Sequence, residues 1–125
     1  SKVNDMSGMF NGAKAFEGEI KSWNTSQVNN MSGMFKEATE FNSNIEKWNT
    51  SQVTDMSYMF DGALKFNRNI KTKGNRWNTS QVKNMSYMFK GAIAFNGQIN
   101  SWDTSQVNDM SRMFQGAVIF SQDIN

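Results

Sequence analysis

The chain has 125 residues, which suits a single domain, and 38% of them are apolar, too many for a disordered protein. The net charge is only +2, and the chain contains neither cysteine nor histidine. Disulfides and thiolate metal sites are therefore excluded, and the commonest general base and metal ligand are missing. Because no apolar stretch is long enough to cross a bilayer, we expect no membrane span in this segment.

A short unit is repeated five times along the chain. It is anchored on a valine, and successive anchor valines lie 25, 25, 29 and 25 residues apart. In each unit two methionines, two phenylalanines, an alanine and an isoleucine follow at fixed positions, which uses all ten methionines and all ten phenylalanines. The longer spacing comes from an insertion within residues 71–76. We predict one domain, 1–125, made of the units 1–27, 28–52, 53–81, 82–106 and 107–125.

The first predicted element of each unit is a short helix. Met6, Met9, Phe10 and Ala13 have the spacing of an apolar stripe on a helix. Methionine at this spacing beside phenylalanine indicates a core, and a soft-metal site is disfavoured. The residue before the first methionine is always Asp or Asn, whose side chains accept hydrogen bonds from a first helical turn. The predicted helix caps are Asp5, Asn30, Asp55, Asn84 and Asp109.

One position bears on where this helix ends. Gly12, Gly62, Gly91 and Gly116 stand where a left-handed glycine often terminates a helix. In the second unit the same position holds Glu37, for which a left-handed backbone would cost about 1–2 kcal/mol. We therefore expect the glycines to reflect tight packing and the helix to continue through the alanine.

The second predicted element is a short strand at Ile20–Thr25 and at its copies. If the units stack in register, these strands form a parallel sheet with about 4.8 Å between neighbours, and identical residues contact each other. The sequence W-N-T-S-Q-V then recurs because the geometry recurs. Its change to W-D-T-S-Q-V at Asp103 is tolerated because Asn and Asp can both accept a hydrogen bond from a turn. The predicted structural ladders are an aromatic column of Trp23, Trp48, Trp77 and Trp102 and a hydroxyl ladder of Thr25, Thr50, Thr79 and Thr104.

One feature is not repeated. Residues 62–102 contain seven basic residues and no acid, whereas residues 1–61 carry five bases and eight acids. The excess is either an uneven solvated surface or a contact for an anionic polymer such as a sulfated glycan. The candidate ligand-binding residues are Lys65, Arg68, Lys71, Lys73 and Arg76.

Catalytic and cofactor chemistry is disfavoured. Ser7 and its copies have no histidine or lysine arrangement that would make a nucleophile, and no two acids pair at a fixed place in the repeat. We therefore expect that the chain is not an enzyme and that it uses no metal and no cofactor.

The unit W-N-T-S-Q-V-N-N-M-S-G-M-F resembles the short repeat of a bacterial surface-protein family found in mycoplasma lipoproteins and Listeria-type surface proteins, akin to the BspA-like leucine-rich repeats. The resemblance covers residues 1–125. It implies a right-handed leucine-rich-repeat-like solenoid on the bacterial surface or outside the cell, and it supplies no catalytic residues. With the two predicted elements, the expected fold is an α/β solenoid of five strand–short-helix repeats with a parallel in-register sheet on one face.

Two classes of function remain open. The first is a non-enzymatic extracellular or cell-surface module for adhesion or recognition, with a host or neighbouring-cell protein or an anionic glycan as partner. The second is a structural stalk, spacer or filament subunit; nucleic acid is disfavoured as a partner. Neither end carries the polar capping unit that repeat arrays usually need. We therefore expect either a longer array or end-to-end self-association.

Overall fold

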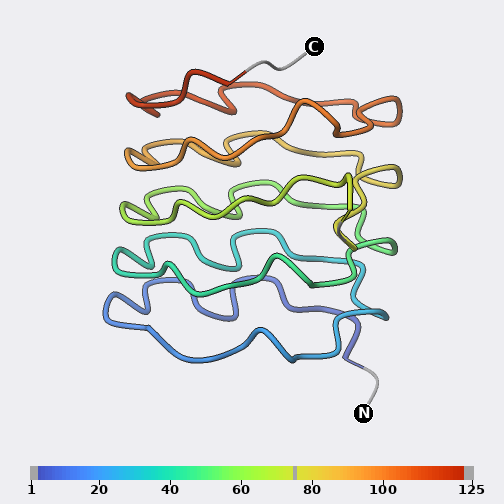
Figure 1. Cartoon of the computed structure of the whole chain (residues 1–125), viewed down its shortest axis with the longest axis horizontal. Coiled ribbons are helices and arrows are strands. Elements are labelled where there is room, and N and C mark those ends of the chain that lie inside the picture. Colours follow the sequence, from blue (N-terminus) through green and yellow to red (C-terminus); the bar gives the residue numbers. More distant parts are fainter. Residues whose placement is uncertain (1–2, 75, 123–125) are drawn as a thin grey trace.

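The five repeats form five layers stacked one on another (Figure 1). The structure is a computed structural model that describes residues 3–74 and 76–122, so Ile124, the last isoleucine of the repeat pattern, lies outside the described residues. Each layer is a flattened loop, and the chain moves up by one layer per repeat. Backbone hydrogen bonds join corresponding segments of neighbouring layers, such as those from the amides of Met6 and Phe10 to the carbonyls of Asn30 and Met34, 2.9 and 2.8 Å long.

The predicted α/β solenoid is wrong, because the layers are built from turns. Residues 3–74 and 76–122 contain no helix, and their extended pairing consists of isolated parallel bridges that form no sheet. The bridged pairs are Asp5–Asn30, Asn30–Asp55, Asp55–Asn84 and Asn84–Asp109. The regular strands and helices of a leucine-rich-repeat-like solenoid are therefore absent from the described residues. The bridges lie at the residues that we expected to cap helices, so these residues are not helix caps.

The predicted helix fails because its amides are divided between two sets of partners. In an α-helix every amide bonds to the carbonyl four residues earlier. Here the amides of Met9 and Asn11 bond to carbonyls three residues earlier, at Met6 and Gly8, 3.2 and 3.0 Å away. The amide of Phe10, which lies between these two, donates to a carbonyl of the next layer instead. The segment is therefore a run of tight turns whose alternate amides join the layers.

The predicted strand fails because a turn interrupts it. The amide of Trp23 donates to the carbonyl of Ile20, 3.1 Å away, and the amide of Val28 donates to the carbonyl of Thr25, 3.0 Å away. Both bonds close the chain on itself within three residues. Stacking of the units in register therefore occurs without a sheet at this face.

The prediction that the helix continues past the glycine position is also wrong, because that position is left-handed. The φ angle is 77° at Gly12 and 76° at Gly62, and it is 58° at Glu37 in the same slot of the second layer. The amides of Gly12 and Glu37 both donate to the next layer, to Lys36 and Asp61. Glu37 therefore adopts a backbone conformation that is sterically unfavourable for a residue with a β-carbon.

We expect Glu37→Gly to raise the free energy of unfolding by about 1 kcal/mol, because glycine adopts the left-handed conformation without steric cost. Urea unfolding of the two proteins measures the change. Glu37→Ala is the matched control, since it removes the carboxylate and keeps the β-carbon. If Glu37→Ala stabilises the chain as much as Glu37→Gly, the effect comes from charge, and left-handed strain at this residue is refuted.

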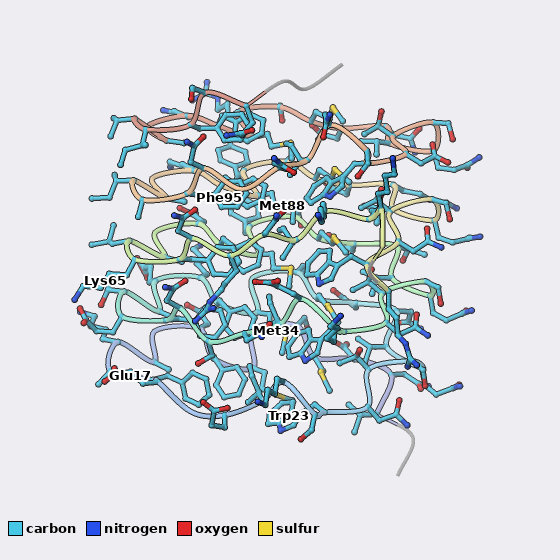
Figure 2. The ribbon with its side chains drawn as sticks, viewed as in Figure 1. Glu17, Trp23, Met34, Lys65, Met88 and Phe95 are labelled. Atoms are coloured by element: carbon cyan, nitrogen blue, oxygen red, sulfur yellow. The ribbon has the colours of Figure 1, made fainter. Side chains whose placement is uncertain are left out.

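The core lies between the two sides of each loop and consists of the repeated apolar residues. Figure 2 shows Met34, Met88 and Phe95 inside the stack, where all three are fully buried, and Lys65 at its rim. Within a layer the two phenylalanine rings stack closely, with centroids 4.0 Å apart for Phe60 and Phe66. Between layers each ring stacks on its counterpart, 5.5 Å apart for Phe60 and Phe89. Each layer therefore covers the apolar face of the next.

No helix of the length and hydrophobicity needed to cross a membrane occurs among residues 3–74 and 76–122.

Candidate functional site

Three of the four tryptophans of the repeat are buried inside the stack and bind the backbone, whereas Trp23 in the first layer is exposed. The four tryptophans form two stacked pairs, with ring centroids 6.5 Å apart for Trp23 and Trp48 and 6.2 Å apart for Trp77 and Trp102. Three of the indole N–H groups donate to the carbonyl of an isoleucine in the layer before, at 2.8–2.9 Å. These bonds run from Trp48 to Ile20, from Trp77 to Ile45 and from Trp102 to Ile70.

The threonines also join the layers, by bonding to backbone atoms. The hydroxyl groups of Thr25, Thr50 and Thr79 donate to the carbonyls of Asn49, Asn78 and Asp103 of the next layer. Thr104, the last copy of this threonine, lies in the fourth layer and is exposed. The first three threonines are fully buried, so the repeated T of W-N-T-S-Q-V serves packing between layers.

The Asn and Asp side chains of the repeat hold turns. The oxygen of Asn24 accepts from the amide of Ser26, and that of Asp103 accepts from the amide of Ser105, at 3.0 and 2.9 Å. The oxygens of Asp5, Asn30, Asp55, Asn84 and Asp109 each accept from the amide of the serine two residues later. Hydrogen bonds from the hydroxyl group of that serine, and then from its amide, lower the pKa of Asp5, Asp103 and Asp109 from its ordinary value. An acceptor oxygen is all that this role requires, which is why Asn and Asp alternate.

Two of the predicted ligand-binding residues have partners in the neighbouring layer. The ammonium group of Lys65 lies 2.7 Å from the carboxylate of Glu40, which raises the pKa of Lys65. Arg68 donates from Nε to the carbonyl of Asn42, 2.8 Å away. Arg68 also lines a hollow that contains Glu17, Glu19 and Glu40. The glutamates around these two side chains therefore make this part of the surface better suited to binding a cation than an anion.

The insertion brings the remaining three predicted residues to the edge of the stack. Lys71 is half-buried, whereas Lys73 and Arg76 are exposed. Between them the hydroxyl of Thr72 donates to the carbonyl of Ser101 in the next layer, 2.9 Å away, and the amide of Thr72 donates to the hydroxyl of Ser101. The insertion is thus tied to the layer that follows it.

Arg76 lies at a second hollow, about 420 Å³ in volume, whose charged groups are all cationic. The other cation is Lys47, which we did not select from the sequence. The remaining lining residues offer amides, hydroxyls and one indole: Ser22, Trp23, Asn24, Thr25, Ser26 and Asn49. The structure therefore separates the predicted basic residues, with Lys65 and Arg68 near glutamates and Arg76 beside a cation of the layer before.

A pattern in the sequence could have pointed to Lys47. The residue directly before the tryptophan is Ser22, Lys47, Arg76 and Ser101 in the four copies. Lys47 and Arg76 thus occupy the same position in adjacent layers, and two like charges in register repel each other. We missed this pair because we read the basic residues as one run of sequence.

Comparison with known proteins identifies a family and no individual relative. The model of a family described as "Mycoplasma protein of unknown function, DUF285" matches residues 1–75 and again residues 72–125. No curated protein and no solved structure shows significant similarity to the chain. The two matches confirm the resemblance to a mycoplasma repeat family, whereas the Listeria and BspA likeness finds no support in them. Adhesion and filament formation likewise find no support in the family description or in the described residues. The chain belongs to this Mycoplasma protein family of unknown function.

Proposed function

We propose that this chain is a non-enzymatic recognition module, secreted or on the bacterial surface, that binds an anionic glycan at the hollow between Lys47 and Arg76. A surface location agrees with the resemblance to the repeats of mycoplasma lipoproteins. The repeated side chains support a non-catalytic role, because the methionines, phenylalanines, tryptophans and threonines pack the layers together. Recognition then falls to positions that differ between copies.

The observation that carries the proposal is the pairing of Lys47 and Arg76 at one position of successive layers, in a hollow whose other lining residues are uncharged. Like charges in register are unfavourable, and an anion bound between them relieves the repulsion. Both residues are exposed, so a ligand can reach them.

The lining also favours a sugar polymer over a small anion. Side-chain amides of Asn24 and Asn49 and the hydroxyls of Ser22 and Ser26 surround the cations. Amides and hydroxyls hydrogen-bond to sugar hydroxyl groups, while the two cations bind sulfate or carboxylate groups. The hollow is open to solvent, which suits an extended chain that continues past it.

Heparin, used as a sulfated-glycan probe, tests the proposal by titration against the chain. We expect the double variant Lys47→Glu, Arg76→Glu to weaken binding about a hundredfold, since two attractive contacts become repulsive. Binding by the unaltered chain should fall steeply between 0.1 and 1 M salt, over which the screening length drops from about 10 to about 3 Å. Neutral dextran should not bind.

The matched control is Lys65→Glu, which reverses a charge that Glu40 already neutralises. We expect it to change heparin affinity less than about threefold. Equal losses in the control and the double variant would mean that net charge alone attracts the probe, and the hollow would not be the site. A structural stalk or spacer stays a prediction, and it would gain support if the chain bound neither heparin nor a protein ligand.

A further inference from the structure

The two tyrosines of the chain, Tyr58 and Tyr87, form a stacked pair at the surface that the repeat does not require. Their ring centroids are 4.7 Å apart and their planes differ by 4°. They occupy the same position in the third and fourth layers, and both rings are half-buried, so their edges reach solvent. No other tyrosine occurs in the sequence.

The backbone at this position disfavours tyrosine. The φ angle is 59° at both tyrosines, and the first two layers place glycine there, at Gly8 and Gly33. The fifth layer places Arg112 in the same left-handed slot, with φ 55°. The backbone repeat therefore does not account for two tyrosines at adjacent copies of a glycine-type position.

The surroundings hold the pair together. Lys36 lies over the ring of Tyr58, with its nitrogen 5.0 Å from the centroid, and Lys90 lies over the ring of Tyr87, 5.4 Å away. Backbone hydrogen bonds also fix the register, since the amide of Tyr58 donates to the carbonyl of Ser86. Two phenols are thus kept in contact, and the oxidant needs only to reach their exposed edges.

We propose that Tyr58 and Tyr87 are an oxidative cross-linking site that forms an intramolecular dityrosine between the third and fourth layers. The co-substrate is a one-electron oxidant, such as a haem peroxidase that uses hydrogen peroxide. Each phenol loses one electron and one proton, and the two phenoxyl radicals join through a carbon ortho to each oxygen. The two hydrogens on these carbons then move to the phenol oxygens through solvent. Overall one C–C bond forms, two hydrogen atoms leave the protein, and one hydrogen peroxide is reduced to two waters.

This cross-link gives the chain a covalent link between layers that needs no thiol. Disulfides cannot form here because the sequence contains no cysteine. A bond between Tyr58 and Tyr87 closes a loop that contains the insertion 71–76 of the third repeat unit. Because such a closure restricts the unfolded chain, the cross-linked protein should unfold at higher denaturant concentration than the uncross-linked protein.

The first test oxidises the unaltered chain with photo-excited ruthenium tris-bipyridyl and persulfate, in buffer and in 8 M urea. At micromolar protein concentration we expect dityrosine fluorescence mainly in the monomer, with a yield roughly a hundredfold higher than that of cross-linked dimers. The reason is that groups held in one molecule have effective concentrations of millimolar or more. Mass spectrometry should show loss of two hydrogens and a peptide pair joined at Tyr58 and Tyr87. In urea the monomeric product should fall about tenfold, because unfolding separates the rings. Mainly dimeric product in buffer, or an equal monomeric yield in urea, would overturn the proposal.

Two matched variants, each with two tyrosines, test whether the tyrosines must lie in adjacent layers. Tyr58→Phe with Arg112→Tyr keeps two tyrosines in neighbouring layers, at 87 and 112, and should retain the monomeric cross-link. Tyr87→Phe with Arg112→Tyr places the tyrosines two layers apart, at 58 and 112, and the monomeric cross-link should fall about tenfold or more. Equal monomeric yields from the two variants would show that stacking in adjacent layers does not direct the reaction.

Discussion

Phe60→Ala is expected to destabilise the chain by about 3–5 kcal/mol, the usual cost of removing a buried phenylalanine ring. Phe60 is fully buried in the middle layer and stacks on Phe66 within the layer and on Phe35 and Phe89 in the layers on either side. The loss is a large part of the roughly 5–15 kcal/mol that stabilises a domain of this size. Urea unfolding followed by tryptophan fluorescence measures the change.

The matched control for this prediction is Phe120→Ala in the last described layer. Phe120 is half-buried and stacks on Phe95 and Phe114. With one neighbouring layer in place of two, we expect it to cost less than about half as much as Phe60→Ala. Equal costs at the two positions would argue that the layers do not depend on stacking between neighbours.

Thr50→Val is expected to cost about 2–4 kcal/mol, although valine and threonine have nearly the same shape. The hydroxyl of Thr50 donates to the carbonyl of Asn78, 3.0 Å away, and accepts from the amide of the same residue, 2.7 Å away. Thr50 is fully buried. Valine would leave a backbone donor and acceptor without partners, and each such group costs about 1–3 kcal/mol when buried.

Two further substitutions show whether the hydroxyl group is the cause. Thr50→Ser keeps the hydroxyl and should recover most of the lost stability. Thr104→Val removes an exposed hydroxyl at the last copy of this threonine and should cost less than about 0.5 kcal/mol. If Thr50→Val is as mild as Thr104→Val, the hydrogen bonds between layers at this position contribute little to stability.

The sequence alone was sufficient to predict that the repeated phenylalanines meet. Copies of one residue contact each other in adjacent layers, as Phe60 and Phe89 do. This follows from repetition, since a residue that packs well against itself is favoured at every copy. The exchange of Asn and Asp in W-N-T-S-Q-V was also explained in advance, because both side chains offer the oxygen that Ser26 and Ser105 bond to.

The secondary structure could not be predicted because one spacing fits two backbones. Met6, Met9, Phe10 and Ala13 lie on one side of a helix, and they also lie on one side of a run of three-residue turns. What separates the two is the direction of alternate amides, which depends on a neighbouring layer. One signal in the sequence was underused: two glycines four residues apart, Gly8 and Gly12, destabilise a helix, and both prove to be left-handed in the structure.

The candidate site also depended on the third dimension. The run of basic residues from Lys65 to Arg76 suggested one surface, but Glu40 neutralises Lys65 from the layer before. Lys47 lies far from this run in sequence and lines the same hollow as Arg76. A linear count of charge cannot show this, because electrostatic energy depends on distance in space.

By itself the sequence determined the phase of the repeats, the membership of the core and the stacking of like on like, because these follow from the order of residues in each copy. Only the tertiary structure decided that the layers are built from turns, that Glu37 is left-handed, and that Lys47 and Arg76 line one hollow. These outcomes depend on hydrogen bonds and charges supplied by neighbouring layers. A backbone amide selects between a partner in its own segment and one in the next layer only when that layer is in place.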